Sequence, residues 1–391
     1  MSANTLYDDV RQHLNNCLGF EVDGSTRDRL ALLIVGMIEA ESASPAQIAK
    51  ALHRLGLSDA TPESIERRIR RIENDPEITD VFCFHPFARH QLLLGKPHEL
   101  LLILDPTTQD DRVYLVTVAV WYRGRALPLA WLAWAANTPL TGERFWVRIQ
   151  KLLDTVAGLL PVGIPVTWLA DRAFGTPQFT DLVQAYGWHY VVRVQGQTRC
   201  QDSRGEEKQV QRLLRHRRRR AKMRGQAFKK QGWRLNSIVA FWGRRHQSPL
   251  CLVSDLPLGW YLLRLYRRRY PIEATFRHYK SKGWQWEKGQ VVDLDHVNRL
   301  LVGMAFATWF AILVGAQQAD EWLQTPSSGN RRTPPWWSKG SLFTIGLHYL
   351  RRAIMGGNTV SLSKPLTRWP CLNWREEIYF HHARTFVFAQ R

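Results

Sequence analysis

Hydrophobic positions in the first part of the chain recur at helical spacing. Apolar residues repeat every three or four positions in Leu30–Ile38 and again in Ile48–Leu55, which is the period of amphipathic helices. Ser44 and Thr61 each precede a proline, a combination typical of a helix start. These patterns predict a helical domain over residues 1–95.

The third of these predicted helices, which begins after Thr61, is strongly basic. Three short helices with a basic final helix are typical of a helix-turn-helix module whose last helix contacts DNA. The alternative is a small helical bundle with a solvated basic face. The candidate DNA-binding residues on this helix are Arg67, Arg68, Arg70 and Arg71.

Strand patterns begin near residue 99. Glu99–Asp105 is an apolar run of strand length that ends in an acid. Two further runs, Val113–Tyr122 and Ala126–Trp134, flank the turn Arg123–Arg125 and predict a β-hairpin. Glu143–Leu160 then has helical periodicity.

The next segment alternates strand and helix. Pro165–Asp171 is a second apolar strand that ends in an acid, Thr176–Tyr186 is helical, and Trp188–Val194 is again a strand. Three antiparallel strands followed by helix, strand, helix and strand predict an α/β fold. We expect an RNase H-like core whose first part covers residues 96–195.

The region after residue 195 is distinguished by its positive charge. The formal net charge of the 391-residue chain is +20, which favours polyanionic partners, with nucleic acid first and an anionic membrane surface second. Lys208–Ser254 contains no acidic residue. The strand-like runs Trp233–Trp242 and Leu250–Val253 therefore predict a basic β-strand insertion over residues 196–256.

The most basic part of this insertion is Arg212–Lys230, which holds ten Lys or Arg residues. Its simplest function is a clamp on DNA phosphates, which makes binding depend steeply on salt. The alternative is a flexible, solvated loop. The candidate phosphate contacts are Arg217, Arg218, Arg219 and Arg220.

Gly259–Trp284 reads as one long basic amphipathic helix, with a break or kink expected at Pro271. This helix begins the second part of the core, over residues 257–316. The most apolar stretch of the chain, Leu300–Gly315, is 16 residues long. That is short for a membrane span, so it predicts a buried core helix.

The last part of the chain, residues 317–391, is predicted to be a linker and a C-terminal helical region. Gln317–Lys339 is rich in Pro, Ser, Gly and Asn and predicts a loop. A final helix is expected at Leu342–Met355. The five cysteines are scattered singly, which fits a reducing compartment without a zinc site. With no recognisable signal peptide, we expect a cytoplasmic protein without membrane association.

Two aspartates are candidates for catalysis. Asp105 and Asp171 each follow an apolar strand, and a carboxylate there is costly unless it is paired or metal-bound. Two-metal phosphodiester cleavage needs converging carboxylates, which suit Mg²⁺. The alternative for each aspartate is an ordinary turn residue that ends a strand. Asp110 and Asp111, in the polar turn beyond the first strand, are weaker competitors.

The third candidate acid is Glu273. Tyr266, Arg269, Glu273 and Lys280 stand at i, i+3, i+7 and i+14, on one face of a continuous α-helix. Such cations can hold DNA phosphates while the carboxylate binds a metal ion. The alternative for Glu273 is a salt-bridge partner in a charged helical network.

These residues carry a family resemblance. Tyr-x2-Arg-x3-Glu-x6-Lys resembles the signature of the cut-and-paste DDE transposases of bacterial insertion sequences, and in particular of the insertion-sequence-four superfamily. Asp171-Arg172-Ala-Phe is similar to that family's second-aspartate motif, and Asp105 after Leu-Ile-Leu resembles its first. The resemblance covers roughly residues 30 to 355.

The resemblance implies an RNase H-like fold with a β-strand insertion between the second aspartate and the glutamate. Asp171 and Glu273 lie 102 positions apart, which leaves room for it. It also implies two Mg²⁺ ions, with Mn²⁺ as a substitute, and a homodimer that acts on double-stranded transposon ends and target DNA. In some members an insertion tryptophan stacks on a flipped base. Trp242 and Trp233 are candidates, or else they pack the insertion's own core.

The sequence thus predicts a transposase that cleaves and transfers DNA strands at terminal inverted repeats, in the bacterial cytoplasm and associated with the nucleoid. Asp105, Asp171 and Glu273 are the predicted catalytic and metal-binding residues. Two other functions stay open: a catalytically inactive or domesticated DNA-binding protein, and another RNase H-like nuclease such as a junction resolvase. The predicted DNA contacts near the acids are Tyr266, Arg269, Lys280 and Arg172.

Overall fold

The computed structural model describes residues 4–19, 22–244, 246–288, 291, 293–324, 340–356 and 360–369. The fold is mixed α/β with a large sheet. The chain forms two compact units, each built from separate segments. The first unit comprises the described parts of Met1–Pro97, Asp105–Ile164 and Pro271–Trp369, and the second includes His98–Leu104 and Pro165–Tyr270.

The N-terminal part of the first unit is helical, as predicted, but it contains more than three helices. Thr61 caps α4, since its side chain accepts a hydrogen bond from Ser64 N at 3.4 Å. Ser44 stands at the N-cap of α3 without a side-chain cap bond, and Pro45 begins that helix. The elements are α1 (Asn4–Cys17), α2 (Gly24–Ala40), α3 (Pro45–Arg54), α4 (Pro62–Glu73), the π-helical turn η1 (Asp80–Phe84) and α5 (His85–Gly95).

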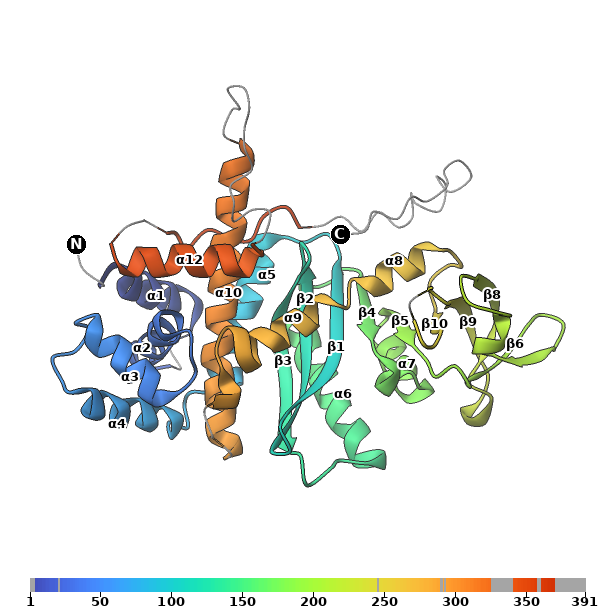
Figure 1. Ribbon diagram of the computed structural model, residues 1–391, viewed down its shortest axis with the longest axis horizontal. Helices are drawn as coiled ribbons and strands as arrows, with labels where there is room; N and C mark the ends of the chain where they lie inside the picture. Colours follow the sequence, from blue (N-terminus) through green and yellow to red (C-terminus); the bar gives the residue numbers. More distant parts are fainter. Residues whose placement is uncertain are drawn as a thin grey trace. The chain divides into compact units, whose positions relative to one another are not determined.

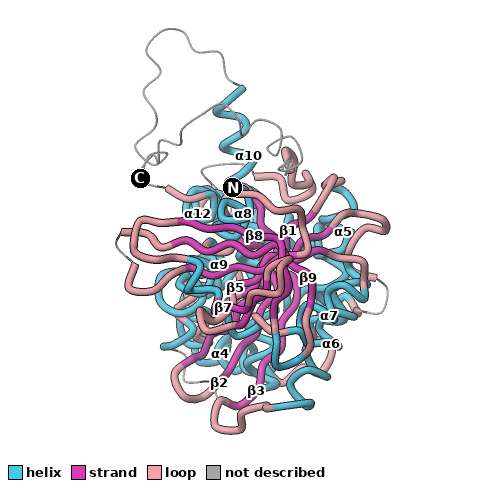
Figure 2. Tube along the Cα trace, turned by 90° about the vertical axis from the view of Figure 1, so that its right-hand side faces the viewer, coloured by secondary structure: helices cyan, strands magenta, loops and turns pink. Residues whose placement is uncertain are grey.

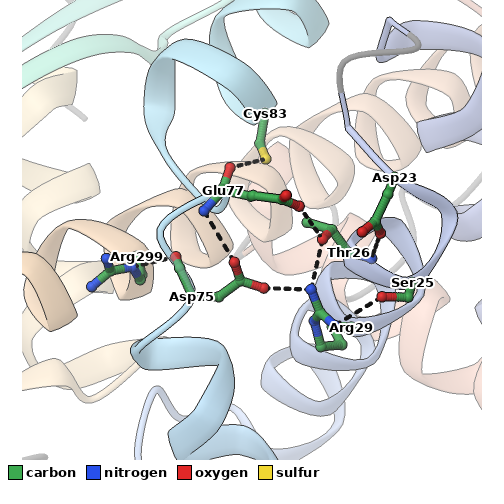
Figure 3. Close-up of polar contacts among 8 residues, drawn as sticks. All are labelled: Asp23, Ser25, Thr26, Arg29, Asp75, Glu77, Cys83 and Arg299. Carbon is green, nitrogen blue, oxygen red and sulfur yellow. Dashed lines mark hydrogen bonds and ion pairs between the residues drawn. The ribbon is translucent and has the colours of Figure 1, made fainter.

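A polar network ties the end of α4 to neighbouring helices (Figure 3). Arg299, on α10 (Leu294–Gln324), donates hydrogen bonds to the backbone oxygens of Glu73 at 2.8 Å and Asp75 at 2.6 Å. The Asp75 carboxylate also accepts from Arg29 of α2 at 2.5 Å. A guanidinium at the C-terminal end of a helix satisfies carbonyls that have no partner within the helix. The network therefore fixes α4 against α2 and α10.

The first unit also contains the predicted hairpin, β2 (Val113–Tyr122) and β3 (Arg125–Ala135). Its turn consists of Arg123 and Gly124, with φ of 47° and 79°, as a type I′ turn requires. The helices α6 (Gly142–Leu159), α9 (Pro271–Arg277) and α10 all pack against β3 (Figure 1). The indole of Trp309 on α10 donates a 2.7 Å hydrogen bond to the backbone oxygen of Pro128.

Helix α10 contains the most apolar stretch of the chain. By length and composition it could cross a membrane, but 94% of its most apolar window is buried inside the structure. This burial fits the core of a soluble protein, as the sequence predicted. The helix runs to Gln324, so the loop predicted from Gln317 is wrong for residues 317–324. The first proline of that stretch is Pro326, and nothing before it breaks a helix. Residues 325–339 lie outside the described part of the chain.

The final predicted helix is present as α12 (Leu342–Ile354), and it crosses α10 at very close range. A Cβ placed on Gly346 would lie 1.6 Å from the backbone oxygen of Ala311, and one on Gly315 would lie 1.9 Å from that of Leu342. The two helix backbones therefore touch where only glycine fits. The C-terminal residues 370–391 lie outside the described part of the chain.

The second unit is built on a sheet in the order β1-β4-β5-β10-β9-β8-β6-β7. Leu100–Leu104 of β1 pair in parallel with β4, and β4 pairs in parallel with β5. The strands of the insertion, among those drawn in magenta in Figure 2, continue this sheet from β5 in antiparallel pairs, beginning with β10. Helix α7 packs against β5. The bounds are β1 (Leu100–Gln109), β4 (Val166–Ala170), α7 (Pro177–Ala185), β5 (His189–Arg193), β6 (Arg199–Gln201), β7 (Glu207–Gln209), β8 (Arg220–Ala227), β9 (Arg234–Phe241) and β10 (Leu250–Ser254).

The predicted long helix Gly259–Trp284 is wrong. The structure has α8 (Tyr261–Arg267), then a turn, α9, and a π-helical turn η5 (His278–Lys282). The break falls at Pro271, as expected, because proline lacks the amide proton and disfavours a helical residue before it. Short 3-10 turns complete the chain at η2 (Arg172–Phe174), η3 (Val210–Leu213), η4 (Lys229–Gln231) and η6 (Trp286–Lys288).

The break also removes the single helix face that the spacing suggested. Tyr266 and Arg269 belong to the second unit, while Glu273 and Lys280 belong to the first. The two compact units divide the chain differently from the five predicted segments, so that segment division stays a prediction.

Candidate active site

Asp171 stands where β4 ends, at the N-cap of η2. The turn is anchored by Phe174, which is 1% exposed. Next to it, a Cβ on Gly175 would lie only 2.2 Å from the backbone oxygen of Arg193 on β5. The glycine therefore lets the turn pack directly on the neighbouring strand, which fixes the position of Asp171.

Two side chains converge on one oxygen of Asp171. The Tyr266 hydroxyl lies 3.3 Å from Oδ1, and Nη1 of Arg193 lies 3.5 Å from the same atom. Among the described residues, nothing hydrogen-bonds to Oδ2. Tyr266 is 1% exposed, and burial is the main cause that raises its pKa above the ordinary value, with Asp171 adding to it. The hydroxyl therefore keeps its proton and donates a hydrogen bond to the carboxylate.

Arg269 lies beside the same tyrosine. Its guanidinium carbon is 5.4 Å from the ring centre of Tyr270 and 5.9 Å from that of Tyr266, within the range of cation–π attraction. Arg269 is buried, with 6% of its surface exposed. The structure thus groups Asp171, Tyr266 and Arg269, three predicted site residues, within the second unit.

Asp105 and Glu273 belong to the first unit. Asp105 is 7% exposed, and it lies close enough to Tyr114 of β2 that its charge, after burial, raises the pKa of that tyrosine. Glu273 is exposed in the first turn of α9. That helix is held to β3 by a 2.8 Å hydrogen bond from the Thr275 hydroxyl to the backbone oxygen of Ala126.

One expectation about Asp105 is corrected. The strand does not end there, because β1 continues to Gln109. The extra residues keep strand geometry because β1 lies beside β2 in the sheet order. Asp110 and Asp111 lie in the turn that follows, as expected. The partner strand β4 ends directly before Asp171, as predicted.

The remaining predicted contacts near the acids lie apart from the Asp171 group. Lys280 is in η5 of the first unit, with its Nζ 3.8 Å from Glu287 Oε1. Arg172 is exposed in η2. In the described part of the chain, no three His, Cys, Asp or Glu side chains form a group that could hold a metal ion. Asp171 nevertheless suits a hard cation, because its side chain is a carboxylate with 30% of its surface exposed.

The basic residues of the insertion do gather at one place. Arg217, Arg218, Arg219 and Arg220 are all exposed. The amide of Arg218 donates to the backbone oxygen of Trp242 at 2.7 Å, and the amide of Trp242 donates to that of Arg219 at 3.0 Å. The guanidinium of Arg217 is 5.7 Å from the Trp242 ring. Arg218 and Arg219, in the middle of the basic run, are thus backbone-paired rather than part of a loose loop, and Arg220 begins β8.

The four arginines of α4 are exposed as well. They are Arg67, Arg68, Arg70 and Arg71. Arg70 forms an ion pair with Glu66 at 2.8 Å. The first 97 residues contain 14 acidic and 11 basic residues. The excess positive charge of the protein therefore lies beyond this helical part, and DNA binding by α4 stays a prediction.

Comparison with known proteins bears on this site. Residues 148–310 match the family model described as the transposase DDE domain. The match supports a DDE transposase family. The matched segment includes Asp171 and Glu273 but begins after Asp105. The match also supports the prediction that the chain is an enzyme of the transposase class. Enzymes of this family use divalent metal ions.

No curated protein sequence matches the chain. Among solved structures, a piggyBac transposase synaptic complex with hairpin DNA is similar at 10% identity and a TM-score of 0.40, covering 92% of this chain and 83% of that one. The catalytic domain of human endonuclease V is similar at 13% identity and a TM-score of 0.26, covering 50% and 87%. Both scores are too low to establish a shared fold.

Sequence reasoning missed Arg193. It ends β5, which pairs in parallel with β4, so its side chain emerges at the same sheet edge as Asp171. The signal was present in the sequence, because Trp188–Val194 was recognised as the next strand and carries one cation near its end. The proximity of Arg193 to Asp171 follows from the order of the strands in the sheet, which residue spacing does not give.

Proposed function

We propose that this chain is a cut-and-paste DNA transposase of the insertion-sequence-four superfamily, which cleaves and transfers strands at terminal inverted repeats. The observation that carries the proposal is the hydrogen bond from Tyr266 to Asp171. It joins the Asp-Arg-Ala-Phe motif to the Tyr-Arg-Glu-Lys motif, which is 95 positions away in the chain. Both motifs lie inside the segment that matches the transposase DDE domain.

The catalytic core of this proposal is RNase H-like, and Asp105, Asp171 and Glu273 together bind two Mg²⁺ ions, or Mn²⁺ in their place. Support comes from strand register. Leu104 of β1 pairs with Ala170 of β4 in parallel, and one peptide bond connects each of these residues to its aspartate. Carboxylate oxygens from separate elements are the ligands that such a centre uses.

The protein's own side chains act by position. Tyr266 and Arg193 both contact Asp171 Oδ1, which orients Oδ2 away from them and toward a ligand. Ions held by these acids would stabilise charge on the leaving oxygen and would lower the pKa of the attacking water or DNA 3′-hydroxyl. Arg269, Lys280 and Arg172 hold the phosphates on either side of the scissile bond. No covalent protein–DNA intermediate forms.

The partners are double-stranded transposon ends and target DNA, bound by a homodimer in the synaptic complex, in the bacterial cytoplasm at the nucleoid. Residues 1–95 bind DNA through α4, and the insertion at 196–256 binds it through the exposed arginines Arg217–Arg220 and Trp242. The core comprises 96–195 and 257–316. Residues 317–391 follow the core and include the end of α10 and helix α12.

The test is a cleavage assay on the DNA that flanks the gene, with Mg²⁺ present. Asp105→Asn, Asp171→Asn and Glu273→Gln should each lower strand cleavage roughly 100-fold or more, because each removes a charged metal ligand. They should leave DNA affinity within about threefold, since the cations that contact the backbone are intact. A variant that cleaves like wild type removes that residue from the proposal.

Asp111→Asn is the matched control. Asp111 lies in the turn just beyond β1, and the substitution removes the same charge near the same strand. We expect cleavage to be unchanged. If all three acid variants cleave normally, the catalytic residues lie elsewhere in the chain. If the wild-type chain binds DNA but shows no metal-dependent cleavage, it is a DNA-binding protein without catalysis.

A further inference from the structure

One face of strand β8 carries a row of cations. Residue exposure alternates along Arg220–Ala227, as expected for a strand with one solvated face. The cations Arg220, Lys222 and Arg224 are all exposed and all on that face. We call these three residues the β8 cation row.

Each member of the row is held by an uncharged neighbour. The ring of Trp260, just before α8, lies 4.5 Å from the guanidinium carbon of Arg220 and 5.4 Å from the Nζ of Lys222. Arg224 donates a 2.9 Å hydrogen bond to the hydroxyl of Ser237. That serine is the register partner of Arg224 on β9, and its own hydroxyl donates to the backbone oxygen of Leu256 at 2.6 Å.

Other cations of the insertion are neutralised by acids. Lys229 lies 2.6 Å from Glu207, and Arg234 makes two hydrogen bonds to Asp181, at 3.1 and 3.0 Å. In the described part of the chain, the β8 cation row makes no ion pair with a carboxylate. Aromatic and hydroxyl partners fix the side chains and leave their charge uncompensated.

We infer that the β8 cation row binds the phosphate backbone of DNA along β8, with Trp260 as a positioning residue for Arg220 and Lys222. Cations two residues apart on a strand are separated by about 6.8 Å. Consecutive phosphates of one DNA strand also wind around the duplex, so they lie about 7 Å apart although each nucleotide rises only about 3.4 Å along the axis. The row therefore matches consecutive phosphates. Long side chains that are ordered in advance lose less entropy on binding.

This inference rests on the proposed function for the identity of the ligand, and it extends the proposed phosphate contacts from Arg217–Arg220 along β8 to Lys222 and Arg224. The first experiment measures binding of the full-length chain to a short labelled DNA duplex over a series of KCl concentrations. Lys222→Gln and Arg224→Gln should each reduce the slope of log affinity against log salt by about 0.9, because each removes one phosphate contact.

Lys229→Gln is the matched control. It removes the same charge from the same insertion, but Lys229 is already neutralised by Glu207. Its slope should equal that of wild type. If Lys222→Gln, Arg224→Gln and Lys229→Gln all leave the slope unchanged, the β8 cation row does not contact phosphates and the inference is overturned.

The second experiment tests Trp260, which carries no charge. Trp260→Leu should weaken binding roughly three- to tenfold at fixed salt, since two cation–π contacts are lost. Its salt slope should stay near that of wild type because every cation remains. Trp260→Phe keeps an aromatic ring and should recover part of the lost affinity. Equal loss in both variants would make Trp260 a packing residue only.

These results separate the inference from the proposed function. Neutral substitutions of Arg217, Arg218 and Arg219 serve for comparison. If they reduce the salt slope of DNA binding but Lys222→Gln and Arg224→Gln do not, the transposase proposal stands and the inference about the β8 cation row is wrong. If the wild-type chain shows no salt-dependent binding to DNA, both fail. If Lys222→Gln and Arg224→Gln both reduce the salt slope but the wild-type chain shows no metal-dependent cleavage, phosphate binding by the β8 cation row is supported. The catalytic proposal is then contradicted.

Discussion

The hydroxyl of Tyr266 and the carboxylate of Asp171, 95 positions apart in the chain, are joined by a hydrogen bond of 3.3 Å. The tyrosine is buried and its pKa is raised, chiefly by that burial, so it is a donor at any physiological pH. A hydrogen bond to a charged acceptor contributes more free energy than a hydrogen bond between two neutral groups. Tyr266 is therefore placed to set the orientation of Asp171.

We expect Tyr266→Phe to lower the rate of DNA cleavage roughly 10- to 100-fold, with DNA affinity little changed. The substitution keeps the ring and removes only the donor, which is worth about 1.5 to 3 kcal/mol when its acceptor is charged. Tyr270→Phe is the control, because Tyr270 also lies against Arg269 but is 44% exposed. Equal rates for the two variants would contradict the orienting role of Tyr266.

Gly175→Ala tests the turn that carries Asp171. The added methyl would meet the backbone oxygen of Arg193 at 2.2 Å, so the turn or β5 must move. We expect a loss of about 1 to 3 kcal/mol in the free energy of unfolding, together with at least a tenfold loss of cleavage. Ala173→Ser, at an exposed position of the same turn, should change neither. Normal cleavage by Gly175→Ala would show that the turn tolerates the shift.

Gly346→Ala should be strongly destabilising without touching the candidate site. Its methyl would lie 1.6 Å from the Ala311 oxygen, where α12 crosses α10. Backbone atoms cannot swing aside, so we expect about 3 kcal/mol or more to be lost. Urea unfolding measures this loss. Gly158→Ala is the matched control: its methyl meets nothing within 4 Å inside α6, and alanine is the better helix former.

Glu73 makes stability depend on pH. It is 3% exposed at the end of α4, and burial raises its pKa to about 7, with Arg70 opposing and Glu66 adding to the shift. The folded state therefore holds this proton more tightly than the unfolded state, for which the ordinary value is 4.5. Its contribution to stability is complete at low pH and is lost as the pH rises from about 4.5 to about 7, by up to about 3 kcal/mol.

The measurement is urea unfolding of wild type and Glu73→Gln at several pH values. The amide has no proton to lose, so Glu73→Gln should become the more stable protein, relative to wild type, as the pH rises. Glu143→Gln, at an exposed position in the first turn of α6, serves as the control. A constant difference between wild type and Glu73→Gln would mean that Glu73 keeps its ordinary pKa.

Elements with a strong local signal could be predicted from the sequence. The Arg123–Gly124 turn, the cap at Thr61 and the buried α10 all follow from residues that are neighbours in the chain. The two apolar runs that precede Asp105 and Asp171 are indeed paired strands. In each case local propensity and tertiary packing favour the same structure.

Other features of the fold and of the candidate sites depend on tertiary contacts, which residue spacing along the chain does not predict. Helical periodicity suggested one face from Tyr266 to Lys280, but Pro271 ends that helix and the residues divide between two units. Arg193 and Trp260 join the candidate sites only through strand order and packing. Asp105 lies inside its strand rather than at its end, because pairing with a later hairpin extends it.

The parallel pairing of Leu100–Leu104 with β4 has a practical consequence for truncation. A fragment cut to the residues that match the transposase DDE domain, 148–310, would begin after β1 and lose this partner. The exposed amides and carbonyls of β4, on a strand that is entirely buried in the whole chain, would then be available to any other polypeptide. Such an open, apolar edge favours aggregation, so the boundary given by sequence similarity is a poor guide to the smallest soluble piece.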